Sequence, residues 1–128
     1  MNHTGEIGER VVVVNLEEET IEREAYAEHL GHAGFAVVGA SDCDEALAML
    51  EERADVRALV TDAHVPGCMD GFELAEVARS RWPHIAVVMM SGHSDASSGP
   101  VPTGAEFISK PYLLSHLVPT LRRMTRAA

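Results

Sequence analysis

Residues 11–16 read Val-Val-Val-Val-Asn-Leu, an apolar and mostly β-branched run that only Asn15 interrupts. A strand with one solvated face alternates apolar and polar residues, whereas a strand covered on both faces has a continuous apolar run. The segment therefore predicts a buried first strand, and the acidic pair Glu17-Glu18 follows it directly.

The rest of the chain alternates between helical and strand patterns. Apolar residues in 19–33 recur at helical spacing, and Gly34 is a typical helix end. A second helix begins after Ser41 or Asp42, where Asp42 and Glu45 resemble a capping box. The remaining expected elements are strands at 35–40, 58–61, 85–90 and 106–108, and helices from Phe72 to before Pro83 and at 113–124. This alternation predicts an α/β fold, a doubly wound parallel sheet with helices on both faces and right-handed crossovers.

Two places break the helical pattern. Residues 91–104 are rich in Ser, Gly and Pro, so the fourth helix of the alternating plan is expected to be short or replaced by a loop. Pro119 falls inside the last helical segment, where it predicts a kink or a late helix start.

Charge and hydropathy exclude several functional classes. Twenty acidic against ten Lys and Arg residues give a net charge of -10 in 128 residues, which repels nucleic acid and anionic lipid. The polar start of the chain lacks the apolar run of a signal peptide, and no later stretch is long enough for a membrane span. We therefore expect a cytoplasmic protein that binds neither nucleic acid nor membrane.

The two cysteines, Cys43 and Cys68, fit no CxxC or paired-ligand spacing. Reduced thiols are the expectation. A redox role for Cys68 has no support at this level, because no cysteine or basic residue neighbours it in the sequence.

Polar residues gather where the predicted strands end. Glu17 and Glu18 follow the first strand, Asp62 ends the third, Ser91 ends the fourth and Lys110 follows the fifth. Each has an ordinary interpretation as a helix-start acid, a turn residue or a solvated charge. However, ligands of open parallel sheets bind at the carboxyl ends of the strands, where these five residues are expected to converge. Lys110 is also the only lysine in the chain, which favours a specific role for a compact ammonium group.

An acidic cluster of this kind predicts phosphoryl-transfer chemistry. Oxygen ligands suit Mg²⁺, and no His or Cys set has zinc spacing. The metal and Lys110 would screen the charge on a phosphoryl group, and Asp62 would be the nucleophile that forms an acyl phosphate.

These residues resemble the receiver domain of two-component response regulators over about residues 10–124. The matching motifs are Val11–Leu16 with Glu17-Glu18, Thr61-Asp62 with Pro66-Gly67 and Met69-Asp70-Gly71, Ser91-Gly92, and Gly104 to Pro111. The resemblance implies a flavodoxin-like sheet of order 2-1-3-4-5. It also implies one receiver domain in residues 1–128, with a polar extension at 1–9 and no output domain.

The resemblance also implies roles for individual residues. Asp62 would accept a phosphoryl group, and Glu17, Glu18, Asp62 and the backbone carbonyl of His64 would hold Mg²⁺. Ser91 and Lys110 would bind the phosphoryl oxygens, and the peptide bond between Lys110 and Pro111 would be cis. Phe107 would be the aromatic switch that turns inward when Ser91 moves. His64 and His93 would flank the pocket and tune hydrolysis of the acyl phosphate, although both also fit as solvated loop histidines.

The sequence departs from the family pattern in the acidic pair, which is Glu-Glu where the family usually has at least one Asp. Cys68 is one residue more than the commonest loop of the family.

Our interpretation is a stand-alone switch, a monomer or weak homodimer, that receives its phosphoryl group from a sensor histidine kinase or phosphotransfer protein and acts on an unknown downstream protein. Its catalysis would be limited to its own phosphorylation and dephosphorylation. One alternative is a pseudo-receiver that acts by protein contact alone, favoured by Glu18, the eroded helix and the pocket histidines. A phosphohydrolase with Asp62 as nucleophile is the other, for which the loops look too short.

Overall fold

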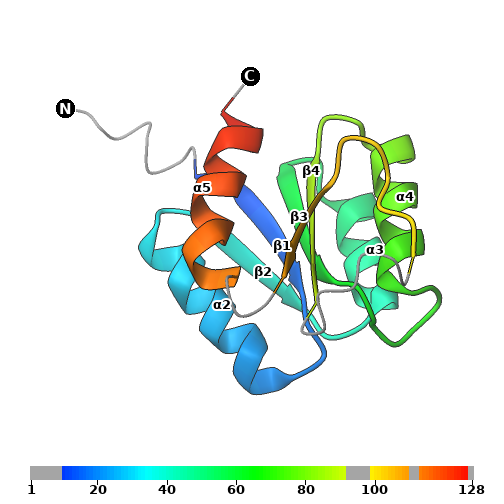
Figure 1. The fold of residues 1–128 in the computed structure, drawn as a ribbon, viewed down its shortest axis with the longest axis horizontal. Coiled ribbons are helices and arrows are strands. Elements are labelled where there is room, and N and C mark those ends of the chain that lie inside the picture. Colours follow the sequence, from blue (N-terminus) through cyan, green and yellow to red (C-terminus); the bar gives the residue numbers. More distant parts are fainter. Residues whose placement is uncertain (1–9, 92–98, 110–112, 127–128) are drawn as a thin grey trace.

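A computed structural model describes residues 10–91, 99–109 and 113–126. A parallel five-stranded sheet in the order β2-β1-β3-β4-β5 forms its centre, as predicted. The strands are β1 (Val12–Leu16), β2 (Ala36–Ala40), β3 (Val56–Asp62), β4 (Ala86–Ser91) and β5 (Glu106–Ser109). The helices are α2 (Thr20–His32), α3 (Cys43–Glu52), α4 (Gly71–Arg81) and α5 (Leu113–Thr125) (Figure 1).

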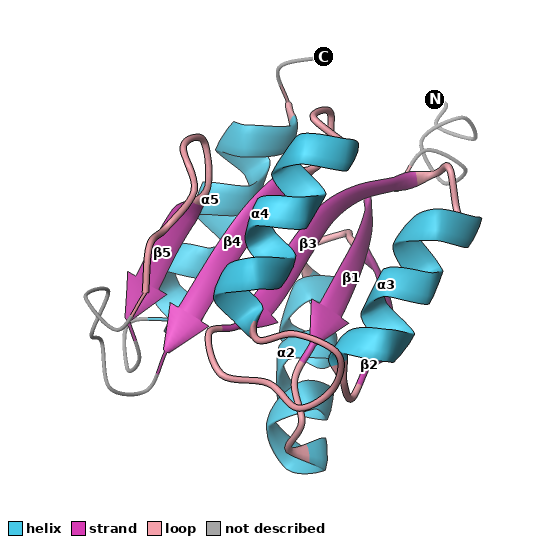
Figure 2. Cartoon of the chain, turned by 90° about the vertical axis from the view of Figure 1, so that its right-hand side faces the viewer, coloured by secondary structure: helices cyan, strands magenta, loops and turns pink. Residues whose placement is uncertain are grey.

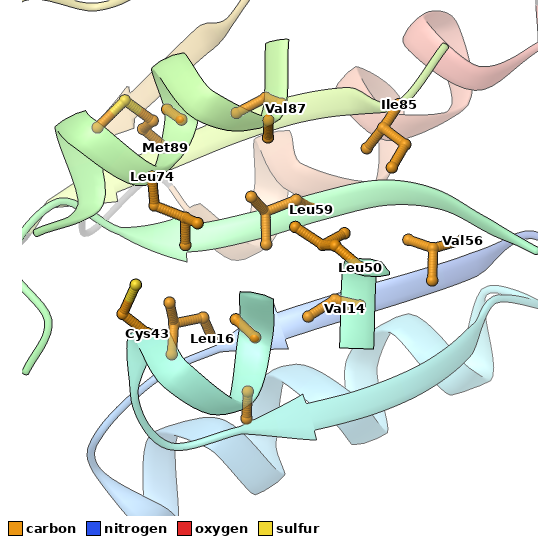
Figure 3. Close-up of a cluster of buried hydrophobic side chains, with 14 of the residues drawn as sticks. Val14, Leu16, Cys43, Leu50, Val56, Leu59, Leu74, Ile85, Val87 and Met89 are labelled. Carbon is orange, nitrogen blue, oxygen red and sulfur yellow. The ribbon is translucent and has the colours of Figure 1, made fainter. Parts of the chain in front are cut away.

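Helices cover both faces of the sheet (Figure 2). Helices α3 and α4 pack on one face and α2 and α5 on the other, and each face has its own apolar cluster. Alternate residues of β1 serve the two clusters, with Val14 and Leu16 on the α3–α4 side (Figure 3) and Val13 on the α2–α5 side. This two-sided burial explains the continuous apolar run of residues 11–16.

The start of β3 differs most from the sequence prediction, and the role of Pro119 in the last helix is decided. Strand β3 begins at Val56, two residues early, because Val56 is fully buried and pairs with Val12. The charged Arg57 interrupts the apolar pattern, so the sequence did not indicate this start. In the fold, the Arg57 guanidinium donates to the carbonyl oxygen of Thr125. Helix α5 begins at Leu113 and contains Pro119, so the proline does not mark a late start.

The connection between β4 and β5 contains no helix in its described part, residues 99–105. This segment packs beside α4, with Val101 and Ala105 against the α3–α4 cluster. Gly99 lies so close to Phe72 that a Cβ there would come within 2.6 Å of the ring. Residues 92–98, which include the first half of the predicted irregular stretch, lie outside the described residues.

Helix α4 begins with a full capping box. The Asp70 carboxylate accepts from the Glu73 amide at 2.9 Å, and the Glu73 carboxylate accepts from the Asp70 amide at 3.2 Å. At α3 the predicted pair is only half formed, because Asp42 caps the Glu45 amide while the Glu45 carboxylate accepts from Ser41. None of the described helices has the length and apolar character needed to cross a membrane.

Candidate functional site at the carboxyl edge of the sheet

All five strands run in one direction, so their carboxyl ends meet at one edge (Figure 2). The register sets Leu16 opposite Thr61 and Asp62 opposite Met90. Glu17, Asp62 and Ser91 therefore come from three adjacent strands and lie at nearly the same level. Glu17 and Ser91 are buried, at 2% and 3% exposure, and Asp62 is half-buried.

The backbone of the β1–α2 loop is held by Arg23, which lies in the first turn of α2. Its guanidinium donates to the carbonyl oxygens of Glu17 at 2.7 Å and Glu18 at 3.3 Å. The buried Asn15 amide in turn donates to the carbonyl oxygen of Arg23 at 3.1 Å. Two neighbouring carbonyls are thus bound to one cation, which orients the backbone that carries both acidic side chains.

Little in the sequence points to this role of Arg23. Its only sequence signal is a basic residue in the first turn of a helix, where the helix dipole favours acids. That signal is weak because the chain contains nine arginines.

We expect Arg23→Met to keep the fold and to weaken divalent-ion binding at the acidic pair by roughly tenfold, or about 1.4 kcal/mol. Methionine retains the packing of the aliphatic stem against Gly39, whereas the two carbonyl contacts are lost. Calorimetric Mg²⁺ titration measures the change, and Arg53→Met, at an exposed ion pair with Asp55, is the control. Equal affinity in Arg23→Met and the parent would remove this positioning role.

The loop after Asp62 is tightly packed at its helix end. The Gly71 amide donates to the carbonyl oxygen of Ala63 at 3.0 Å, and a Cβ on Gly71 would lie 2.1 Å from the carbonyl oxygen of Asp62. Only glycine fits this approach. Strand β3 and helix α4 are therefore joined by direct backbone contact beside the candidate nucleophile.

The other predicted site residues are placed as follows. Glu18 and His64 are exposed, and the His64 ring meets Phe72 edge-on with the ring centroids 6.0 Å apart. Phe107 is half-buried, pairs in register with Met89 and packs against the α3–α4 cluster. Strand β5 ends at Ser109, and Lys110, Pro111 and His93 lie outside the described residues.

The side chains at this edge offer oxygen atoms, the type of ligand that Mg²⁺ prefers. Glu17 and Asp62 offer carboxylates on adjacent strand ends, which are the hard ligands that this ion prefers. One Glu17 oxygen accepts from the Glu19 amide at 3.1 Å. Within the described parts of the chain, no three His, Cys, Asp or Glu side chains gather closely enough to enclose a metal ion. In proteins Mg²⁺ is commonly bound through one or two carboxylates and keeps several water ligands.

Comparison with known proteins identifies the family. The family model of the response regulator receiver domain matches residues 11–122, and the chain belongs to this family. The hydrogenase transcriptional regulatory protein HoxA of Cupriavidus necator is 31% identical over 122 residues, 92% of this chain and 25% of that protein. A putative response regulator NtrX-like of Rickettsia bellii is 32% identical over 117 residues, 88% of this chain and 24% of that protein. The chain spans about a quarter of the length of these relatives.

Solved receiver structures have the same fold. A response regulator receiver protein from Sinorhizobium medicae superposes with a TM-score of 0.82 at 29% identity, over 93% of this chain and 97% of that chain. NtrX from Brucella abortus gives a TM-score of 0.80 at 28% identity, over 91% of this chain and 27% of that chain. Receiver domains are signalling modules of two-component systems, and they generally bind Mg²⁺ at their phosphorylation site.

Proposed function

We propose that this protein is a phosphorylation-dependent switch in which Asp62 accepts a phosphoryl group. The observation that carries the proposal is the register of β1, β3 and β4, which brings Glu17, Asp62 and Ser91 to one edge. A carboxylate needs no deprotonation at neutral pH, so Asp62 is ready to attack phosphorus. The P–N bond of a phosphohistidine donor breaks as the Asp62 O–P bond forms, and the imidazole leaves.

The surrounding residues have separate tasks in this proposal. The Ser91 hydroxyl donates to a phosphoryl oxygen, and Lys110 binds another by analogy with the family. Glu17, Glu18, Asp62 and the His64 carbonyl would hold Mg²⁺, with the Glu18 side chain turning in from its exposed position, and the ion would neutralise phosphoryl charge. His64 and His93 tune hydrolysis at the pocket mouth.

Phe107 and the peptide bond before Pro111 belong to the conformational change that would follow phosphorylation in this proposal. Phe107 lies on the strand next to Ser91 and is half-buried, and it would turn further inward when Ser91 moves toward a phosphoryl group. By analogy with the family, the peptide bond between Lys110 and Pro111 is proposed to be cis.

The expected phosphoryl donor is a sensor histidine kinase or a phosphotransfer protein. The expected target of the signal is a downstream protein. A net charge of -10 favours protein partners over nucleic acid. We assign the switch to the cytoplasm, acting as a monomer or weak homodimer.

A matched pair of variants separates the two acidic residues. We expect Glu17→Gln to weaken Mg²⁺ binding by at least about tenfold, and Glu18→Gln to weaken it less. The reason is that Glu17 is buried one residue beyond the Leu16–Thr61 pair, whereas Glu18 is exposed. NMR titration with Mg²⁺ compares them. A larger loss in Glu18→Gln would reverse this ranking.

A second candidate function is a pseudo-receiver that signals by protein contact without phosphorylation. The exposure of Glu18 and the lack of a three-ligand cluster among the described residues favour it. Incubation with acetyl phosphate and Mg²⁺ distinguishes the two. A covalent adduct of one phosphoryl group supports the switch, and no adduct, with no response to beryllofluoride, supports the pseudo-receiver.

A further inference from the structure

The two cysteines meet in space although 25 positions separate them. The Sγ atoms of Cys43 and Cys68 lie 2.9 Å apart, and both are free thiols. Cys43 is the first residue of α3, beside Leu16 in Figure 3, and Cys68 lies in the loop between β3 and α4. Cys68, which has no cysteine near it in the sequence, therefore has a thiol neighbour in the folded chain.

Backbone packing brings the thiols together. The Cys43 amide donates to the carbonyl oxygen of Pro66 at 2.9 Å. Gly67 has φ +115°, and a Cβ there would lie 2.9 Å from the Cys43 nitrogen. The loop thus presses its Pro-Gly turn against the start of α3, and Cys68 follows directly. The contact is a consequence of the loop's fold and not of two flexible side chains meeting by chance.

The two thiols differ in accessibility. Cys43 is fully buried, and burial beside Cys68 raises the pKa of its thiol to about 12. Cys68 is exposed. An oxidant can therefore reach Cys68. Cys43 is sheltered from the oxidant, but its sulfur lies close enough to react with an oxidised Cys68 sulfur.

We propose that Cys43 and Cys68 form a redox-modification site that closes to an intramolecular disulfide under peroxide. In the first step the Cys68 sulfur attacks one peroxide oxygen, the O–O bond breaks, and Cys68 becomes a sulfenic acid with release of water. In the second step the Cys43 sulfur attacks the Cys68 sulfur, the S–O bond breaks, and a second water carries away the hydroxyl group and the Cys43 proton. The two sulfurs lose two electrons, which one peroxide accepts. A dithiol reductant reverses the bond by exchange.

Closure needs little movement, because the sulfurs must shorten their separation from 2.9 Å to about 2.05 Å. The bond would attach the loop that leaves Asp62 to α3 and limit its motion. It would also restrict the unfolded chain, which is the main way in which a disulfide stabilises a fold. This inference does not depend on phosphorylation of Asp62.

Mass spectrometry tests the bond directly. After treatment of the reduced protein with hydrogen peroxide, we expect a mass lower by two hydrogen atoms. Tryptic digestion without reductant should join peptide 24–53, which contains Cys43, to peptide 58–79, which contains Cys68. Dithiothreitol should restore both separate peptides. Stable oxidation of Cys68 to the sulfinic acid, or dimers between chains with no internal link, would overturn the proposal.

Two variants make the test specific. Position 68 is exposed, so Cys68→Ser should fold normally, but this variant should form no internal disulfide. Cys43→Ala removes only a sulfur from the core and should leave a Cys68 sulfenic acid that dimedone traps. In the parent protein, dimedone should label little Cys68. Equal trapping in both would show that Cys43 does not resolve the intermediate.

The physical consequence is measured on the same samples. Oxidation should raise Tm by roughly 10 °C and slow amide hydrogen exchange in residues 63–70, with neither effect in Cys68→Ser. A linked protein with unchanged exchange in this loop would contradict the proposed restriction of its motion.

Discussion

Asp62→Asn is expected to take up no phosphoryl group from acetyl phosphate and Mg²⁺, whereas the parent protein gains one. The amide is nearly isosteric with the carboxylate but is not a nucleophile, so the attack on phosphorus is lost and the fold is kept. The half-buried side chain at the end of β3 tolerates the change. Intact-protein mass spectrometry measures the adduct, and circular dichroism checks the fold.

Asp70→Asn is the matched control for that experiment. It makes the same chemical change eight residues later, at the N-cap of α4, where asparagine caps as well as aspartate. This variant should keep its phosphoryl uptake. An adduct in Asp62→Asn, or equal loss in both variants, would refute Asp62 as the phosphoacceptor.

Gly71→Ala is expected to lower the free energy of unfolding by about 3 kcal/mol or more. The added Cβ would lie 2.1 Å from the carbonyl oxygen of Asp62 and 2.7 Å from that of Ala63. Both are backbone atoms, so neither can turn aside as a flexible side chain would. The start of α4 must move away from β3, and the bond from the Gly71 amide to Ala63 is lost with it. Urea unfolding followed by circular dichroism measures the change.

Gly31→Ala provides a control of opposite sign. Gly31 lies in α2, and a Cβ there would meet nothing within 4 Å. Alanine should therefore stabilise the helix by up to about 1 kcal/mol. If Gly71→Ala proved as stable as the parent, the close backbone approach between β3 and α4 would not exist in solution.

Pattern analysis predicted the fold because the relevant information is local. The apolar run of 11–16 marks a strand buried on two faces, and the alternation of strand and helix patterns predicts a parallel sheet. The sheet order came with the family resemblance and is confirmed. Local patterns missed the start of β3 at Val56, because Arg57 contacts the carbonyl oxygen of Thr125 across the fold. The last helix was predicted correctly, and it continues through Pro119 without a late start.

For the candidate site, position after a strand was enough to name Glu17, Asp62 and Ser91 as neighbours, since parallel strands end at one edge. Their chemical roles stay proposals. Residues 92–98 and 110–112 are not described, so the predictions for His93 and Lys110 rest on sequence alone.

Hydrophobic periodicity along the chain was enough to predict the alternating elements, and with them the edge at which the acidic residues gather. Two contacts became visible only in the folded chain: Arg23 binds the carbonyls of Glu17 and Glu18, and Cys43 meets Cys68. These contacts depend on how loops fold back on the helix starts. Backbone hydrogen bonds and close packing set that geometry, and neither leaves a periodic signal in the sequence.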